Sequence, residues 1–158
     1  MAIMADSVFQ RVETLLRGRG VALDVLRHAP VYTSEEAARV RGTPLASGAK
    51  ALVCKADDAV VMFVLPADRK LDSKAVRQGQ GWRKLRFASR EEVLQITGLE
   101  PGSIPPFGSL FGLPTFCDTR LGENEKINFN AGDHSISVSM SYADYLRVES
   151  PKLGTFAE

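Results

Sequence analysis

Ala49-Lys-Ala-Leu-Val-Cys-Lys55 and Ala59-Val-Val-Met-Phe-Val-Leu65 are two apolar runs that flank the pair Asp57-Asp58. β-Branched and aromatic residues favour strands, whereas adjacent aspartates favour a tight turn. The stretch therefore predicts a hairpin of two buried strands, and we expect this hairpin to form the centre of a sheet.

Helices and shorter strands are predicted on both sides of this hairpin. Residues 1–20 have the pattern of an amphipathic helix that Asp6 or Ser7 caps and that Gly18 or Gly20 ends. Capping residues and periodicity predict helices over 35–38, 71–78, 90–97 and 142–146, and strands over 21–27, 82–87, 115–118, 126–130 and 135–140. This order predicts a mixed α/β fold of the α+β class, with a largely antiparallel sheet flanked by helices.

The composition is that of one ordinary globular domain covering residues 1–158, with 44% apolar and 25% charged residues. No apolar run is long enough to cross a bilayer, and the N-terminus lacks the basic start and cleavage site of a secretory signal. We therefore expect a cytoplasmic protein. Cys54 and Cys117 are too few for a disulfide framework and are expected to be buried.

The charge is unevenly distributed although the formal net charge is only +1. Residues 69–90 hold eight basic side chains against the single acid Asp72, whereas residues 91–158 hold four basic and ten acidic side chains. A concentrated positive segment suits contact with a polyanion, and a solvated basic face is the alternative.

Several common catalytic patterns are absent from the sequence. Its only histidines are His28 and His134, and it has no Cys-x-x-Cys or His-x-x-x-His pair, no Gly-x-Ser-x-Gly motif and no Walker loop. A metal site, a nucleophilic triad and a triphosphatase are therefore not indicated, and no cofactor is expected.

A lysine, a loop and a turn remain as candidates for chemistry. Lys50 enters a buried strand, where a lysine either reaches solvent or meets an anion. The Gly- and Pro-rich stretch 98–114 is either a rigid connector or a loop that aims backbone N–H groups at an oxyanion. His134 is either a substrate-orienting group or a strand-start histidine satisfied by Asp133, and His28 is either structural or a rim contact.

Five blocks of sequence, taken in order, resemble the YbaK-like family, which includes the editing insertion domain of bacterial prolyl-tRNA synthetase. The resemblance covers about residues 20–148. The blocks are His28-Ala-Pro-x-Tyr32-Thr-Ser-Glu-Glu-Ala-Ala38, Gly48-Ala-Lys50-Ala-Leu, Leu71-Asp-Ser-Lys74, Thr97-Gly-Leu-x-Pro-Gly102-Ser-Ile-Pro-Pro-Phe-Gly108 and Asn130-Ala-Gly-Asp-His134.

The resemblance implies a bent, largely antiparallel sheet and hydrolysis of misacylated tRNA, usually tRNA for proline. It implies that Lys50 holds the phosphate or ribose end of the terminal adenosine, that Gly102 and Ser103 bind the scissile carbonyl and its water, and that His134 helps to size or orient the aminoacyl group. The remaining residues that it implicates in substrate binding are His28, Ile104, Pro105, Phe107, Gly108, Asn130, Gly132 and Asp133.

The resemblance also implies partners. The acceptor end of tRNA would lie against the basic segment, with prolyl-tRNA synthetase as a possible partner and neither DNA nor membrane involved. The expected tRNA contacts are Arg69, Lys70, Lys74, Arg77, Trp82, Arg83 and Lys84.

The amino acid that is removed stays open between alanine, serine, threonine, cysteine and 2-aminobutyrate. Alanine-specific relatives tend to place Asn after the lysine, whereas Ala51 follows Lys50 here, which favours serine or threonine. Two other functions remain as alternatives, an inactive tRNA- or synthetase-binding module and a nucleotide-binding regulator. A charged Lys50 beside a carbonyl-binding loop favours the hydrolase over the inactive module.

Overall fold

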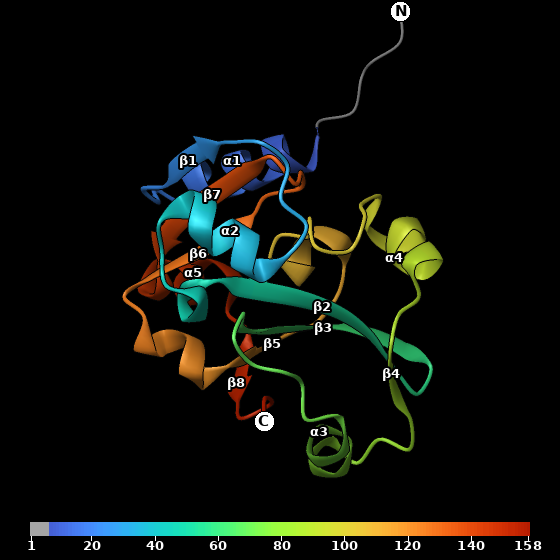
Figure 1. Cartoon of the computed structure of the whole chain (residues 1–158). Coiled ribbons are helices and arrows are strands. Elements are labelled where there is room, and N and C mark those ends of the chain that lie inside the picture. Colours follow the sequence, from blue (N-terminus) through green and yellow to red (C-terminus); the bar gives the residue numbers. More distant parts are fainter. Residues whose placement is uncertain (1–6) are drawn as a thin grey trace, which may run out of the picture.

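The computed structural model describes residues 7–158, and its central feature is the hairpin of β2 (Ala49–Ala56) and β3 (Ala59–Pro66) (Figure 1). The two strands pair antiparallel, with Lys50 opposite Leu65. Asp57 adopts the left-handed conformation at the turn, with φ 52°. The predicted central hairpin is therefore confirmed.

The strands in the described part of the chain form two sheets. The other strands are β1 (Asp24–Arg27), β4 (Leu85–Phe87), β5 (Thr115–Asp118), β6 (Lys126–Asn130), β7 (Ile136–Ser141) and β8 (Lys152–Gly154). One sheet has the order β4-β2-β3-β5-β8, and the other is the antiparallel sheet β1-β7-β6. An isolated bridge between Gly48 and Asn128 joins them where β2 begins.

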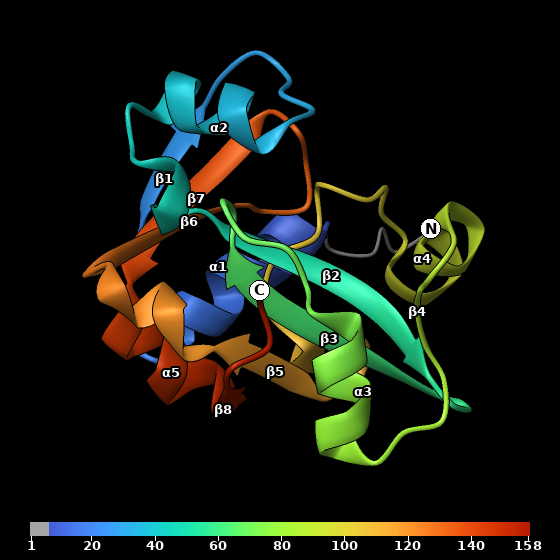
Figure 2. The same ribbon diagram turned by 60° about the horizontal axis from the view of Figure 1, so that its bottom comes forward.

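Within residues 7–158, five helices surround the sheets (Figure 2). They are α1 (Val8–Gly18), α2 (Ser34–Arg41), α3 (Ser73–Gln80), α4 (Arg90–Thr97) and α5 (Tyr142–Glu149), and 3₁₀ turns cover Leu45–Ser47, Gly108–Phe111 and Thr119–Glu123. Each helix is preceded by a side chain that accepts a hydrogen bond from an amide of its first turn, and the helix predicted over 71–78 begins two residues later than expected, at Ser73. These caps are Ser7, Thr33, Asp72, Ser89 and Ser141. The part of the first predicted helix before Ser7 lies outside the described residues.

Alternate residues of β3 enter different hydrophobic clusters, which explains why the hairpin is apolar throughout. Met62 and Val64 face a large cluster that also contains side chains of α1 and α5, whereas Phe63 and Leu65 face a smaller cluster with Phe116. Because side chains alternate along a strand, a strand buried on both faces loses the usual apolar and polar alternation.

Three details of the predicted secondary structure were wrong. The short strand β8 was not expected, and β5 pairs in parallel with both β3 and β8. The strand predicted over 82–87 is confined to β4, because the amide of Trp82 donates to the carbonyl of Arg77 and the amides of Arg83 and Lys84 donate to the side chain of Asp57. Among the described residues no helix is long and apolar enough to cross a membrane.

Candidate functional site

A cavity of about 350 Å³ lies where the two sheets meet. Its wall is formed by α2, by the beginning of β2, by the loop around Gly102 and by the end of β6. None of the residues that line it is acidic, and two, Arg41 and Lys50, are cationic. The cavity therefore suits a ligand with oxygen acceptors or negative charge.

Lys50 lies on the cavity wall, as the second residue of β2. Its ammonium donates a hydrogen bond to the carbonyl oxygen of Arg69, in the segment that follows β3. Partial burial lowers the pKa of Lys50, and the carboxylates of Asp68 and Glu35 act against that shift. The side chain is thus held at the cavity by one hydrogen bond and retains donors for a ligand.

Residues on both sides of Ser103 line the cavity. Gly102 and Ile104 line it, and neither of their amides donates a hydrogen bond to the described part of the chain. The carbonyl oxygen of Gly102 accepts a bond of 2.7 Å from the side chain of Asn130. The loop is therefore fixed through the carbonyl group of Gly102, and the amides of Gly102 and Ile104 remain without an acceptor among the described residues.

The inner half of the same loop is part of the core. Phe107 is fully buried and packs edge-on against Phe129 and Tyr145, and the hydroxyl of Ser103 donates to the carbonyl of Glu100. Contact with substrate was expected for these loop residues, and the structure places them behind the cavity wall. Those that are buried and do not line the cavity are Ser103, Pro105, Phe107 and Gly108.

His134 supports the Gly102 loop from outside the cavity. Its Nδ1 lies 3.2 Å from the carbonyl oxygen of Val31 and its Nε2 lies 3.5 Å from a carboxylate oxygen of Glu100. A Cβ atom on Gly102 would come within 3.5 Å of the imidazole. Because Asp133 bonds to Ser135, it does not satisfy His134 as one reading of the sequence expected.

Arg41 is a residue of the site that sequence reasoning missed. Its guanidinium donates to Ser137 Oγ and to Asn130 Oδ1, both at 2.8 Å, and no carboxylate of the described residues pairs with it. Burial lowers the pKa of Arg41 to about 10. Ser137 also bonds to His28 Nε2 at 2.8 Å, so His28 joins this network and does not line the cavity. Periodicity could not reveal Arg41, because it ends a helix whose predicted range stopped at residue 38.

Two asparagines of β6 face the cavity. Asn128 and Asn130 both line it, and the neighbouring residues Ile127 and Phe129 belong to the large hydrophobic cluster, although part of Phe129 also reaches the cavity wall. The alternation along a strand accounts for this arrangement. The sequence contained a signal for it, since two polar residues alternate with apolar ones, but only Asn130 was expected at the site.

The turn after β6 is structural. Gly132 has φ 86°, and a Cβ atom there would lie 2.9 Å from the Cβ of Val8. Its amide donates to the carbonyl oxygen of Ser103, and the turn thereby holds the loop in place. Neither Gly132 nor Asp133 lines the cavity, although both were expected to bind substrate.

The basic segment lies outside the cavity but borders it. Phe87 and Ala88, at the end of β4, line the cavity, and Arg86 is paired with Glu92 at 2.7 Å. The ring of Trp82 is engaged in the smaller cluster and is only partly accessible. The expected contacts with charged side chains are all at least partly exposed, and they are Arg69, Lys70, Lys74, Arg77, Arg83 and Lys84.

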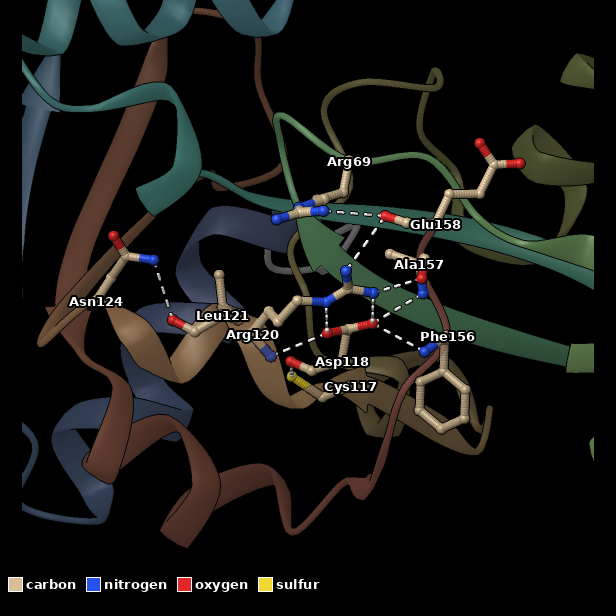
Figure 3. A network of polar contacts seen from close by, with 9 residues as sticks. All are labelled: Arg69, Cys117, Asp118, Arg120, Leu121, Asn124, Phe156, Ala157 and Glu158. Atoms are coloured by element: carbon tan, nitrogen blue, oxygen red, sulfur yellow. Dashed lines mark hydrogen bonds and ion pairs between the residues drawn. The ribbon is translucent and has the colours of Figure 1, made fainter. Parts of the chain in front are cut away.

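The C-terminal segment is anchored by a buried carboxylate (Figure 3). Asp118, with a fully buried side chain, accepts hydrogen bonds of 2.8 Å from the amides of Phe156 and Ala157, and its other oxygen accepts from the amide and side chain of Arg120. Arg120 in turn donates to the carbonyl of Ala157. The carboxylate is thus satisfied by both a cation and backbone donors.

Hydrogen bonds connect the C-terminal segment that Asp118 anchors to residues 69–72, and the carbonyl oxygen of Arg69 in turn binds Lys50. The amide of Glu158 donates to the carbonyl of Lys70, and the amide of Asp72 donates to the carbonyl of Phe156. Arg69 donates from its side chain to the carbonyl oxygen of Glu158 and accepts from Lys50 through its own carbonyl oxygen. Asp118 therefore supports the position of Lys50 from the opposite side of β3.

The groups of the site suit catalysis by electrostatic stabilisation. Burial raises the pKa of Cys54 and Cys117 to about 12, so these thiols stay protonated and are not nucleophiles at neutral pH. The described residues contain no group of three His, Cys, Asp or Glu side chains that could hold a metal ion. The two free amides and two cations can instead stabilise negative charge on an ester oxygen.

Comparison with known proteins identifies the family. Residues 28–148 match the aminoacyl-tRNA editing domain. The chain belongs to this family. The Multifunctional Ser/Thr-tRNA deacylase ProXp-y of Escherichia coli (strain K12) is 38% identical over 152 residues, which cover 93% of this chain and 91% of that protein.

Other members of the editing-domain family agree with this assignment. The Prolyl-tRNA editing protein ProX of Acetoanaerobium sticklandii is 26% identical, with 84% of each chain covered. A crystal structure described as a candidate trans-editing enzyme for prolyl tRNA synthetase superposes with a TM-score of 0.85 at 25% identity and covers 98% of this chain and 99% of its own. The mixed α+β fold expected from the sequence is therefore confirmed.

Replacing Gly102 by alanine in this editing domain is expected to reduce deacylation and to destabilise the fold by about 1–2 kcal/mol. Gly102 has φ 89°, which an L side chain rarely adopts, whereas the new Cβ would make only an ordinary van der Waals contact with His134. Amino acid release and urea unfolding measure the two effects. Gly18→Ala is the matched control, because no atom lies within 4 Å of its Cβ position. Equal activity of both variants would contradict the role of the loop.

Proposed function

We propose that this editing domain is a trans-editing hydrolase, which cleaves the ester that joins a small non-cognate amino acid to the 3′ end of tRNA for proline. The observation that carries the proposal is the cavity that Lys50 lines together with Gly102 and Ile104, whose amides have no acceptor among the described residues. Family membership supports the reaction class, and the named relatives act on Ser/Thr-tRNA and prolyl-tRNA.

Hydrolysis at this site needs positioning and electrostatic stabilisation. Water adds to the carbonyl carbon of the ester, and the negative charge on the carbonyl oxygen is met by the amides of Gly102 and Ile104. The bond to the ribose oxygen then breaks, which releases the amino acid and a ribose hydroxyl. Lys50 holds the ribose or phosphate end of the terminal adenosine. An aminoacyl ester is already reactive, so oriented water and an oxyanion site suffice without a covalent nucleophile.

The tRNA itself would approach over the basic segment. Arg69 and Lys70 follow β3 beside Lys50, and the exposed cations of α3 and its following turn extend the same charge outward. Phosphate contacts of this kind position a nucleic acid without reading its sequence. Trp82 is left out of this interface because its ring packs on Phe63 and Phe116.

The decisive experiment is amino acid release from a panel of mischarged tRNAs for proline. Esters of serine, threonine, alanine, cysteine and 2-aminobutyrate are compared with the cognate prolyl ester and with buffer. We expect at least one non-cognate ester to be cleaved far faster than prolyl-tRNA. If none is cleaved faster than in buffer while AMP binds tightly, the chain is a nucleotide-binding regulator and the hydrolase proposal is wrong.

A further inference from the structure

Asn128 is a buried polar side chain at the cavity that the proposed mechanism does not use. It is 5% exposed and lies at the centre of β6, opposite Ser139 of β7. A β-bridge between the backbones of Asn128 and Gly48 places Asn128 beside the beginning of β2. Gly48 precedes Lys50 by two residues. A side chain in this position contacts whatever fills the inner part of the cavity.

The orientation of the Asn128 amide is fixed by a chain of hydrogen bonds. The hydroxyl of Ser47 lies 2.6 Å from the carbonyl oxygen of Pro44, and since a carbonyl only accepts, Ser47 must donate there. Ser47 Oγ is then the acceptor in its contact of 3.0 Å with Asn128, so Asn128 directs its NH₂ group to Ser47. The carbonyl oxygen Oδ1 is consequently the atom left over.

Oδ1 of Asn128 has no donor among the described residues, yet it is not sealed in the core. No backbone or side-chain group of the described chain donates to it, and it is not one of the fully buried atoms without a partner. It therefore opens on the cavity that Asn128 lines. A largely buried acceptor without a donor is costly, so a ligand that supplies a donor gains at this position.

We propose that Asn128 determines specificity by accepting a hydrogen bond from the side-chain hydroxyl of a serine or threonine ester. This inference rests on the proposed hydrolase function and names its substrate class. Alanine and 2-aminobutyrate esters fit the same space but leave Oδ1 unsatisfied. A site that is built around a hydrogen bond discriminates against the analogue that lacks it more strongly than an apolar pocket separates sizes.

The test compares two ester pairs that differ by the hydroxyl group, serine with alanine and threonine with 2-aminobutyrate. We expect the wild-type protein to favour the hydroxylated member of each pair by at least about tenfold in kcat/KM. Asn128→Leu retains the volume and removes the acceptor, so it should abolish this preference chiefly by slowing the serine and threonine esters. Asn124→Leu makes the same change outside the cavity, since Asn124 bonds to the carbonyls of Ala46 and Leu121, and should retain the preference.

Failure of this inference differs from failure of the proposed function. If the esters are cleaved and each pair is cleaved equally by the wild-type protein, the hydrolase stands and the role of Asn128 is wrong. An equal loss for all four esters in Asn128→Leu would assign Asn128 to the α-ammonium group or to packing, and it too would overturn the proposal. Ser47→Ala, which frees the amide to rotate, tests the same point if Asn128→Leu does not fold, and it should weaken the preference.

Discussion

Lys50→Met is expected to lower kcat/KM for deacylation by roughly 10–10²-fold, because it removes the charged donor that holds the terminal adenosine, an interaction of about 1.5–3 kcal/mol. Methionine retains the aliphatic stem of the lysine, so the strand and the cavity wall should persist. Only the ammonium is removed, which bonds to the Arg69 carbonyl and faces the cavity. Rates of amino acid release under single-turnover conditions measure the effect, and thermal melting checks the fold.

A lysine of the same strand provides the control for this experiment. Lys55 is partly buried near the other end of β2, and it does not line the cavity. Lys55→Met makes the same chemical change and should leave kcat/KM unchanged. A Lys50→Met protein that melts normally and deacylates within twofold of wild type would remove Lys50 from the mechanism.

Asp118→Asn should destabilise the protein by about 3–5 kcal/mol, because it leaves the buried edge of Arg120 without its charge partner. The asparagine NH₂ group would also meet amides that now donate to the carboxylate, those of Phe156 and Ala157. For a chain of this length the melting temperature should fall by roughly 10 °C. Urea unfolding measures the free energy, and Asp144→Asn is the control because its pair with Arg147 is exposed.

The contribution of Asp118 should depend on pH in a defined direction. Burial alone would raise the pKa of Asp118, but hydrogen bonds from Arg120 and from the two C-terminal amides outweigh it, so the pKa lies below its usual value. A lowered pKa stabilises the fold above the unfolded value of about 3.9, and the gain is lost as pH falls through the folded pKa. The stability difference between wild type and Asp118→Asn should therefore shrink below about pH 4. A difference that is constant from pH 7 to pH 3 would contradict this account.

Most of the helices and strands could be predicted from the sequence. The hairpin, most helix starts and the strands over 115–118 and 126–130 follow from local patterns, because caps, turns and periodicity act within a few residues. The order of five blocks was enough to indicate the family. The parallel pairing of β5 with β3 and β8 could not be predicted from the sequence, since it joins segments that are far apart in the chain.

Candidate residues were harder to assign than elements. Lys50, Gly102, Ile104 and Asn130 reach the cavity as expected, whereas Phe107 and Ser103 lie behind its wall. The difference arises within one loop, of which Gly102 and Ile104 line the cavity whereas Ser103 and residues 105–108 are buried behind it. A glycine- and proline-rich composition indicates a shaped loop, but it does not specify which side each residue faces.

By itself the sequence determined the class of the fold, the central hairpin and the family, because these depend on local propensity and on the order of motifs. Only the tertiary structure decided which polar groups share the cavity. Arg41 and Asn128 come from a helix and a strand far apart in the chain, and they line one wall because Gly48 pairs with β6. The packing of the folded chain decides which groups are buried, which lose their hydration and which hydrogen-bonding atoms are left without a partner. The order of residues along the chain does not show these properties.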